Sequence, residues 1–341
     1  MFERRDKLLK NTESEQRSPT FVQILIVNQQ FPFSLSVIFT THNEAPNIRA
    51  ALESVAPWAS DILVVDAFST DGTVEIIEQF GGIRLLQRAY FGPADQKNWA
   101  IPQAKNDWVL LMDADERATP EMRDEIAKIL RGYFELNTSL RGTKQINEAF
   151  KTSSNVSSSV VKNENLDALE NNELELINNS NSSNITIFDG YWIGFTHFFM
   201  GKKVRFSGWQ NDKTIRLIQR DRCRYNDNRV HEEIVTEGRK MGRLNAKFDH
   251  YTFRDIAHFV QKQQRYAAWS AIDHDKKTGR ITAFHFVVKP FFRFFKHYFL
   301  KLGVLDGKIG FIIAAVAAWS VFLRYVKIVE NRQLRQQNPK A

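Results

Sequence analysis

Four short apolar runs, separated by segments with helical spacing, constrain the fold of this chain more than any other feature. The runs lie within residues 34–43, 61–70, 83–90 and 107–116. Apolar residues fill the centre of each run, as expected for strands that are covered on both faces. The segments between them, residues 44–59, 73–82 and 94–105, have the spacing of helices. Alternating strands and helices predict an open α/β domain with a mostly parallel sheet and helices on both faces.

Polar side chains follow three of these predicted strands, at the point where each strand ends. They are Thr40, Thr41, His42, Asn43 and Glu44 after the first strand, Asp66 and Ser69 after the second, and Asp113 and Asp115 after the fourth. In open α/β sheets, ligands bind in the crevice beyond the carboxyl ends of the strands. We therefore expect the three loops to meet at one cleft.

The segment WVLLMDADERATPEM places Asp113, Asp115 and Glu116 at the end of a buried strand. Carboxylates at the edge of a core are costly unless a positive group pairs with them. An Asp-x-Asp pair can offer oxygen ligands to Mg²⁺ or Mn²⁺, which also binds substrate phosphates. On the residues alone an alternative stays open, in which Asp115 and Glu116 cap the helix that begins near Pro120.

Three segments in register resemble the family 2 glycosyltransferases of the GT-A fold. These are SVIFTTHNEAPNI, ILVVDAFSTDGT and DWVLLMDADE. The resemblance implies a Rossmann-like domain in which Thr40, Asn43 and Glu44 contact the nucleotide. It also implies that Asp66 binds the base, that Asp113 lies by the ribose, and that Asp115 holds Mg²⁺ or Mn²⁺ against the diphosphate. The family often has two adjacent acids after the second strand, whereas here Ala67 and Phe68 follow Asp66.

A further match to the family is the stretch ADQKNWA, where Lys97 and Asn98 are implied near the diphosphate or the Asp115 loop. For Lys97 the alternative is an ordinary solvated residue of a helix. Either reading is compatible with the residues alone, because a lysine on a predicted helix carries no signal of its burial.

The segment NRVHEEIVTEG contains the best candidates for a general base, because an inverting sugar transfer needs one acid or base near the acceptor hydroxyl. Together with TEGRKMG and DHYTF, it resembles bacterial lipopolysaccharide-core β-glucosyltransferases. We predict Glu232 as the base and Glu233 as its rival. His231 is predicted to contact the metal, with a structural role as the alternative for it and for His250. Trp209 and Arg216 resemble acceptor-side positions, and for Trp209 a core or lid role is the alternative.

Composition divides the chain into six predicted segments. Residues 1–33 read as a leader without a secretory signal, and residues 34–136 as the nucleotide-sugar half. Residues 137–185, rich in Asn and Ser, read as a disordered insertion. Residues 186–282 form the predicted acceptor-side half with the base, residues 283–330 a basic aromatic tail, and residues 331–341 a flexible C-terminus.

The predicted tail interleaves aromatic and basic residues in KPFFRFFKHYFLKLG, in a chain with 27 Phe and a formal net charge of +8. Such a pattern favours a helix that lies in a membrane interface, with Pro290 near its start. The later run of residues 309–323 is short for a membrane span, so we expect a buried or interfacial helix there. The alternatives are a spanning helix, a tail that only packs in the core, and a nucleic-acid-binding surface.

Taken together, these features predict an enzyme, an inverting glycosyltransferase that moves a hexose, with glucose expected, from a UDP-sugar to a lipid-linked or lipopolysaccharide-core glycan. Its partners are the donor, the acceptor and a membrane surface, without nucleic acid. The single Cys223 excludes an internal disulfide, which suits the cytoplasm and the inner face of its membrane. The alternative class is a non-catalytic protein that binds nucleotide, or binds nucleic acid through the tail.

Overall fold

The computed structural model describes residues 34–135, 138, 188–226, 232–253 and 255–337. The predicted leader and, apart from position 138, the whole predicted insertion lie outside the described residues. Both assignments therefore stay predictions.

The four predicted strands form the parallel part of a nine-stranded sheet. They are β1 (Leu35–Thr41), β2 (Asp61–Asp66), β3 (Arg84–Gln87) and β4 (Trp108–Asp113), in the order β3-β2-β1-β4. All neighbouring pairs among them are parallel. The strands end earlier than the predicted runs, because the polar residues that follow leave the ladder and enter loops. The parallel α/β prediction is confirmed for this part of the chain.

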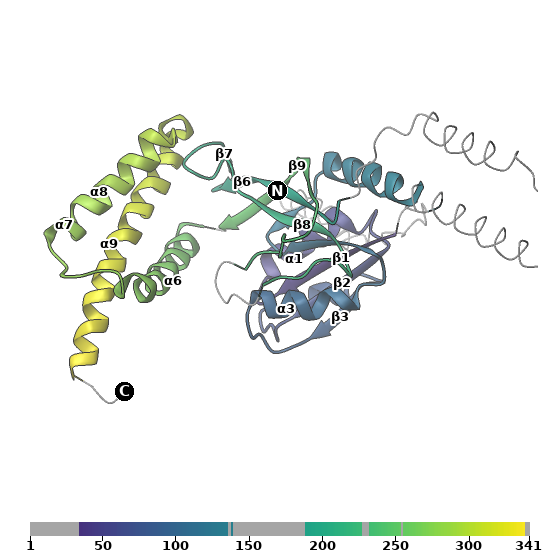
Figure 1. The fold of residues 1–341 in the computed structure, drawn as a ribbon, viewed down its shortest axis with the longest axis horizontal. Coiled ribbons are helices and arrows are strands. Elements are labelled where there is room, and N and C mark those ends of the chain that lie inside the picture. Colours follow the sequence, from purple (N-terminus) through teal and green to yellow (C-terminus); the bar gives the residue numbers. More distant parts are fainter. Residues whose placement is uncertain (1–33, 136–137, 139–187, 227–231, 254, 338–341) are drawn as a thin grey trace, which may run out of the picture.

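Five further strands extend the sheet beyond β4 and make it mixed. They are β5 (Glu116–Arg117), β6 (Gly190–Phe199), β7 (Lys202–Val204), β8 (Lys213–Gln219) and β9 (Met241–Phe253). Strand β8 pairs antiparallel with β4 and with β6, and β9 pairs parallel with β6 and antiparallel with β5. Figure 1 shows β6 and β9 extending from the parallel part toward the C-terminal helices.

Helices cover both faces of the parallel strands. On one face, α1 (Ala45–Val55), α2 (Thr73–Glu78) and the helical residues 120–135 pack on one apolar cluster. On the other face lie α3 (Pro93–Ala100) and the 3-10 turn Ile101–Gln103. Successive residues of β4 pack on opposite faces of the sheet. Leu110 belongs to the apolar cluster on the first face and Leu111 to the cluster on the second face. Each such buried leucine contributes about 1.5–3 kcal/mol, which explains why the strand is apolar throughout.

The C-terminal helices form a separate unit beyond the end of β9 (Figure 1). It contains α6 (Ile256–Asp275), α7 (Ala283–Phe286), α8 (Val288–Phe295), the π-helical turn η2 (Lys296–Leu300), the 3-10 turn η3 (Gly303–Asp306) and α9 (Gly307–Gln337). Ala271 of α6 packs in one cluster with Val321 and Tyr325 of α9. This unit therefore begins at α6, earlier than the predicted boundary at residue 283, and α9 continues past the predicted end of the tail at residue 330.

Asp306 joins this helical unit to the loop that follows β7. Its carboxylate accepts hydrogen bonds from the backbone N–H of Arg205 (3.0 Å), the backbone N–H of Phe206 (3.0 Å) and the hydroxyl of Ser207 (2.8 Å). Gly303 lies in the same contact, where a Cβ atom would stand 2.7 Å from the carbonyl oxygen of His297. Only glycine fits at that position without a shift of backbone.

Candidate active site

The loops that follow β1 and β2 are tied to one another by buried polar contacts. Asp66 is fully buried, and its carboxylate accepts hydrogen bonds from the Thr41 hydroxyl (3.1 Å) and the Ser69 backbone N–H (2.8 Å). Asn43 has a positive φ of 56° and accepts a 2.8 Å bond from the Thr70 backbone N–H. Asp66 thus organises this loop, and its contact with a nucleotide base stays a prediction.

The other predicted nucleotide contacts lie at the same edge of the sheet. Thr40 stands opposite Asp113 in the register of β1 and β4. The carboxylate of Glu44 accepts a 2.8 Å hydrogen bond from Asn47 Nδ2, while its backbone N–H donates to the Thr73 hydroxyl at 2.8 Å. The fold therefore brings the loops after β1, β2 and β4 to one edge, as the strand order predicted.

Arg216 bridges the two carboxylates nearest the end of β4. Its Nη2 atom lies 2.5 Å from Asp113 Oδ2 and 2.6 Å from Glu116 Oε1. Glu116 is fully buried, and its Oε2 atom accepts a 3.0 Å bond from the Asp113 backbone N–H. Arg216 itself is 5% exposed, so it lies beneath the site and not on an open acceptor surface. The guanidinium supplies the positive charge that makes these acids tolerable at a sheet edge.

Burial and charge move the pKa values of these acids in opposite directions. Burial acts to raise the pKa of Asp113, but Arg216 and Lys97 more than offset it, so this pKa is lowered. Burial raises the pKa of Glu116 to about 7, although Arg216 opposes the shift. Asp113 consequently keeps its charge to lower pH than Glu116 does.

The alternative that Asp115 and Glu116 cap the following helix is wrong. Residues 120–135 are helical, and the Thr119 hydroxyl accepts the 3.3 Å bond from the Met122 backbone N–H at the start of that helix. Glu116 instead lies in β5, opposite His250 of β9. These acids serve the cleft because a strand, and not a helix, follows Asp115.

Lys97 is a buried cation between two halves of the site. It is 7% exposed, and its Nζ atom lies 3.7 Å from Asp113 Oδ1 and 3.5 Å from Glu232 Oε1. Burial opposes its charge, but Asp113, Tyr225 and Glu232 together more than offset this, so the pKa of Lys97 is raised. The alternative of a solvated helix residue is therefore wrong for Lys97.

The segment that carries Glu232 is held by α3. Asn98 donates from Nδ2 to the Tyr225 carbonyl oxygen at 2.9 Å and accepts from the Tyr225 backbone N–H at 2.8 Å. Glu232 is half-buried beside Lys97, whereas Glu233 is exposed and its carbonyl oxygen accepts a 2.9 Å bond from the Asn226 backbone N–H. Of the two candidate bases, the structure brings Glu232 to the cleft. Asn98 is engaged with this backbone, which differs from its expected place at the diphosphate.

Asp115 lies beside His250. The Asp115 Oδ2 and His250 Nε2 atoms are 3.5 Å apart, and the Tyr251 backbone N–H donates to the Asp115 carbonyl oxygen at 2.8 Å. His250 Nδ1 is buried and has no hydrogen-bond partner among the described residues. His231, the other predicted metal contact, lies outside the described residues.

The donor atoms at this point fit a Mg²⁺ or Mn²⁺ ion that is shared with a substrate. Among the described residues, no group of three or more His, Cys, Asp and Glu side chains could hold a metal by itself. Mg²⁺ is usually held by one or two carboxylates together with substrate phosphates and water, so one free carboxylate suffices. Asp115 is the better candidate, because Asp113 is already engaged by two cations, Arg216 and Lys97, whereas Asp115 has only the 3.5 Å contact with His250 among the ion pairs of the described residues.

Trp209 packs inside the structure on the side of the C-terminal helices. Its ring centroid lies 5.4 Å from that of His197 and 5.8 Å from that of Phe253. His197 in turn lies 5.1 Å from His250, measured between ring centroids. A wall of rings therefore runs from Trp209 to the neighbour of Asp115, which matches the core or lid alternative for Trp209.

The sequence assigned no binding or catalytic role to three residues at this edge. Glu116 is the first, because its pairing with Arg216, which is distant in the chain, cannot be seen in the sequence. Tyr90 is another: burial and then the charge of Glu232 raise its pKa, which places it near the base. Phe68 is the third, since it is 54% exposed with a positive φ of 56°, a costly conformation for a bulky residue. The only sequence signal was the departure from the family pattern at Phe68.

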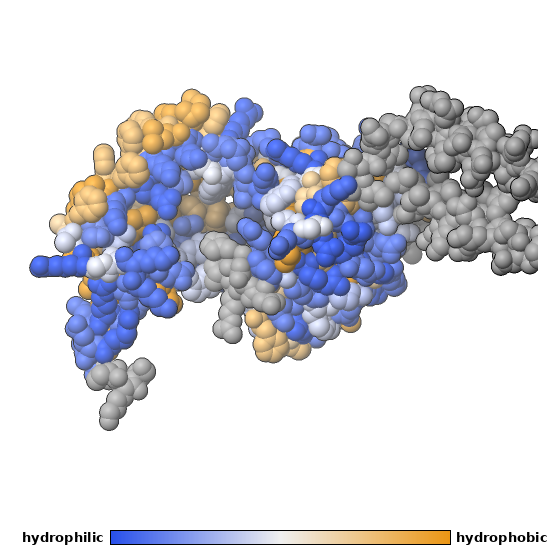
Figure 2. Space-filling model, viewed as in Figure 1, coloured by the Kyte–Doolittle hydropathy of each residue, from blue (hydrophilic) through white to orange (hydrophobic). Residues whose placement is uncertain are grey.

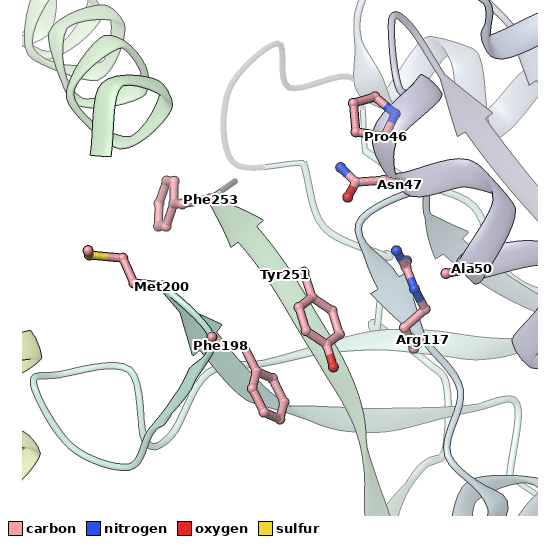
Figure 3. Close-up of a pocket in the computed structure, with 9 residues that line it drawn as sticks. Pro46, Asn47, Ala50, Arg117, Phe198, Met200, Tyr251 and Phe253 are labelled. Atoms are coloured by element: carbon pink, nitrogen blue, oxygen red, sulfur yellow. The ribbon is translucent and has the colours of Figure 1, made fainter. Parts of the chain in front are cut away.

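A groove lies between α1, β5, β6 and β9 (Figure 3). Its volume is about 510 Å³. Tyr251 stacks on Phe198 there, with ring centroids 4.8 Å apart, and the Arg117 guanidinium lies 5.5 Å from the Tyr251 centroid. Aromatic planes beside a cation and an amide suit a sugar or another polar ring.

Residues 36–189 match the family described as Glycosyl transferase family 2. This part of the chain is a family 2 glycosyltransferase domain. The match covers β1 to β4 and the loops that carry Asp66, Asp113 and Asp115, so the family resemblance and the GT-A type of fold are confirmed. The protein is a glycosyltransferase.

Curated relatives of this glycosyltransferase extend over most of its length. An uncharacterized glycosyltransferase of Rickettsia felis is 26% identical over 87% of this chain and 90% of its own. The lipopolysaccharide core biosynthesis glycosyltransferase LpsC of Rhizobium meliloti is 24% identical over 88% of this chain and 94% of its own. The similarity thus extends well beyond residues 36–189.

Among solved structures, the glycosyltransferase is similar to glucosyl-3-phosphoglycerate synthase of Mycobacterium tuberculosis, in complex with Mn²⁺, UDP and glucosyl-3-phosphoglycerate. The identity is 22%, with a TM-score of 0.23. The match spans 25% of this chain and about a third, 34%, of that chain.

Proposed function

We propose that this glycosyltransferase moves a hexose, with glucose expected, from a UDP-sugar to a hydroxyl of a lipid-linked or lipopolysaccharide-core glycan, with inversion at the anomeric carbon. The observation that carries the proposal is the position of Glu232. Its carboxylate lies 3.5 Å from Lys97, whose ammonium also lies 3.7 Å from Asp113 at the carboxyl end of β4. A half-buried carboxylate at the ligand-binding edge of an α/β sheet suits a general base.

In the proposed reaction, Glu232 accepts the proton of the acceptor hydroxyl. The hydroxyl oxygen forms a bond to the anomeric carbon as the bond from that carbon to the diphosphate oxygen breaks, and UDP leaves with the electron pair. One displacement of this kind inverts the configuration and needs no nucleophilic residue. Lys97 holds Glu232 in place and balances its charge together with that of Asp113.

We assign Asp115, with the neighbouring His250, as the residues that would hold Mg²⁺ or Mn²⁺. When bound, such an ion neutralises charge on the departing diphosphate. Thr40, Asn43 and Glu44 are assigned to the nucleotide because they lie at the end of β1 and on the loop that follows it, at the same sheet edge as Asp113 and Asp115. Arg216 positions Asp113 from below.

A membrane-bound acceptor is supported by the surface of the helical unit. Its large apolar side chains are exposed, as the orange patch over α8 in Figure 2 shows. They include Phe291 (68%), Phe292 (57%), Phe295 (39%) and Phe299 (48%). Cations at residues 296, 301 and 308 accompany them, which suits anionic headgroups at the inner face of the cytoplasmic membrane. The relative named for lipopolysaccharide core biosynthesis agrees with such an acceptor.

One stretch of the described residues, Gly303–Gln337, is also long and apolar enough to cross a bilayer, and 33% of its most apolar window is buried. Because α9 packs along α6 and α8, we favour a helix that lies against the unit at the membrane surface.

The test incubates the purified full chain with a panel of UDP-, GDP- and CDP-sugars in the presence of Mn²⁺ and measures release of the nucleotide. We expect turnover of a UDP-hexose that EDTA abolishes. Binding of UDP without turnover of any sugar would instead favour a non-catalytic nucleotide-binding protein. Tight, salt-dependent binding of an oligonucleotide without UDP binding would favour the nucleic-acid alternative.

A further inference from the structure

A second, smaller cavity of about 150 Å³ lies where the helical unit meets the sheet. It is lined by residues of α6, α8, η2 and α9 and by the loop after β7: Trp209, Phe259, Gln263, Arg293, His297, Ile313, Ala317 and Ser320. Its polar members are hydrogen-bond donors or a cation, and none of its lining residues is an acid. This cavity lies outside the cleft of Asp115 and Glu232.

Arg293 is oriented in this cavity by His297. His297 Nδ1 lies 3.0 Å from the Ser207 carbonyl oxygen, which can only accept, so Nδ1 carries the proton. The other ring nitrogen, Nε2, then accepts from Arg293 Nη1 at 3.2 Å. Burial lowers the pKa of His297, so the ring is neutral at pH 7 and brings no charge of its own. The remaining N–H groups of the Arg293 guanidinium have no carboxylate partner among the described residues.

Two further cations flank Arg293 on neighbouring turns. Lys289, on the same face of α8, donates from Nζ to the Tyr325 hydroxyl at 2.8 Å. Arg324, one turn beyond Ser320 on α9, has a buried Nε atom with no partner among the described residues. Its Nη1 atom lies 3.4 Å from His274 Nε2.

Two acids of the helical unit, Asp306 and Asp275, are committed elsewhere. Asp306 is bound by the loop that contains Ser207, and Asp275 pairs with Arg332 and Arg335. Within the part of the chain that the structure describes, no ion pair joins Lys289, Arg293 or Arg324 to a carboxylate. Half-buried cations without a counter-charge are unfavourable, so this face is suited to an anion that comes from outside the chain.

We propose that this cavity binds the phosphate ester headgroup of a membrane lipid. An arginine fork, a hydroxyl from Ser320 and an amide from Gln263 offer several donors to one tetrahedral anion, which favours phosphate over a carboxylate. The volume suits a single phosphate group, because pockets for whole nucleotides and similar ligands are about 300–1,000 Å³. A UDP-sugar is therefore too large to bind in this cavity.

The position of the cavity fits a lipid in particular. On α8, Lys289 and Arg293 lie on the face toward α9, while Phe291, Phe292 and Phe295 are exposed on the outer face. A lipid whose phosphate enters the cavity can extend its chains along these rings. Trp209 lines the cavity and begins the wall of rings that leads through His197 to His250, beside Asp115. This inference rests on the proposed function. The cavity would hold an acceptor lipid within reach of the residues that carry out the sugar transfer.

The experiment measures binding of the full chain to vesicles by flotation. Phosphatidylcholine vesicles carry either phosphatidic acid or oleate at equal negative charge, so that only the phosphate differs. We expect the wild type to bind the phosphatidic acid vesicles about tenfold more tightly, because a phosphate has enough oxygens to accept from Arg293, Ser320 and Gln263 together, whereas a carboxylate has only two. Arg293→Gln is expected to lose this preference. Lys296→Gln, which removes an exposed cation on the next turn, is expected to weaken both kinds of binding equally.

Two further measurements keep the outcome clear. Ser320→Ala and Arg293→Lys are expected to reduce the preference with smaller risk to folding, which thermal unfolding checks. Inorganic phosphate and glycerol 3-phosphate, tested by thermal shift, report whether the cavity accepts a phosphate without a lipid. Equal binding of both vesicles by the wild type, an unchanged preference in Arg293→Gln, or saturation by soluble phosphate without a vesicle preference would overturn the lipid site. UDP binding is measured in parallel, because its loss would concern the transfer site and not this cavity.

Discussion

Lys97 and Glu232 are 135 positions apart in the chain, yet the Lys97 ammonium lies 3.5 Å from the Glu232 carboxylate. One residue comes from α3, on a face of the parallel sheet, and the other from the segment between β8 and β9. Their contact joins the half of the site that receives the donor to the half that carries the proposed base. Most of the testable consequences of the structure follow from this junction and from the neighbouring Asp115.

Glu232→Gln is expected to lower the rate of sugar transfer by a factor of about 10²–10⁴, because a general base typically contributes that much. The amide keeps the shape of the side chain, so UDP binding is expected to persist. Glu233→Gln, at the exposed neighbouring position, is the matched control and is expected to leave the rate unchanged. Initial rates of UDP release with an acceptor check this, and equal rates for Glu232→Gln and the wild type would remove the base assignment.

Asp115→Asn is expected to abolish Mn²⁺-dependent binding of UDP, since an amide is a far poorer ligand for a hard cation than a carboxylate. Calorimetric titration with UDP, with and without Mn²⁺, measures this directly. Asp95→Asn, on the exposed side of α3, is the control and is expected to bind as the wild type does. Undiminished Mn²⁺ dependence in Asp115→Asn would show that the ion binds elsewhere.

Arg216→Met is expected to destabilise the fold by about 3–5 kcal/mol, because it leaves the fully buried Glu116 without its cation and Asp113 with Lys97 alone. Urea unfolding followed by circular dichroism gives the free energy of unfolding. Arg220→Met removes a partly exposed arginine whose partners, Asp107 and Asp221, are exposed, and is expected to cost about 0–1 kcal/mol. Similar losses in the two variants would contradict the bridging role of Arg216.

Asp61 is expected to contribute stability that disappears in acid. Burial acts to raise its pKa, but the hydrogen bonds from Arg84 and Ser36 more than offset this, so the pKa is lowered below its ordinary value of 3.8. The unfolded chain therefore binds the proton more tightly, and the contribution is present above pH 3.8 and is lost as the pH falls through the folded-state value.

Asp61→Asn tests this contribution. We expect a loss of about 1–3 kcal/mol at neutral pH, since Arg84 would lose a bidentate partner, and a smaller loss in acid. Thermal unfolding of both proteins at several pH values between 3 and 7 measures the difference. Asp124→Asn, at an exposed pair with Arg123, is the control. A pH-independent difference between wild type and Asp61→Asn would contradict the linkage.

Replacing Phe292 and Phe295 together by serine is expected to weaken binding to anionic vesicles. Each ring that leaves the interface costs about 1.5–3 kcal/mol when its burial was complete, and less when it was partial. Flotation assays compare the variant with Phe134→Ser, which removes an exposed phenylalanine outside the helical unit. Equal flotation of the two variants would place the membrane contact elsewhere.

The sequence was most informative where the chain is locally regular. The apolar runs around Val37, Val64 and Leu110 fixed the parallel strands, because strands covered on both faces must be apolar throughout. The polar residues at their ends located the cleft, because the loops at one edge of such a sheet converge. The order of three family motifs then named the enzyme class.

Other features depend on pairings that no local pattern encodes. The antiparallel strands β6, β8 and β9 bring Arg216 under Asp113 and His250 beside Asp115. A distant register also decides that Glu232 faces Lys97 while Glu233 faces solvent. The interaction between two side chains falls off within a few ångströms, so residues far apart in sequence act together only after the whole sheet has closed.

The amino-acid sequence alone thus determined the α/β layers, the acidic edge and the aromatic, basic character of the C-terminal helices, since these follow from hydrophobic periodicity and short motifs. Tertiary structure alone decided which charges are paired, which carboxylate is left beside the cleft, and that Arg293 faces a cavity without an acid. Burial and charge compensation are properties of the packed molecule, because each depends on every neighbour that replaces water around a group.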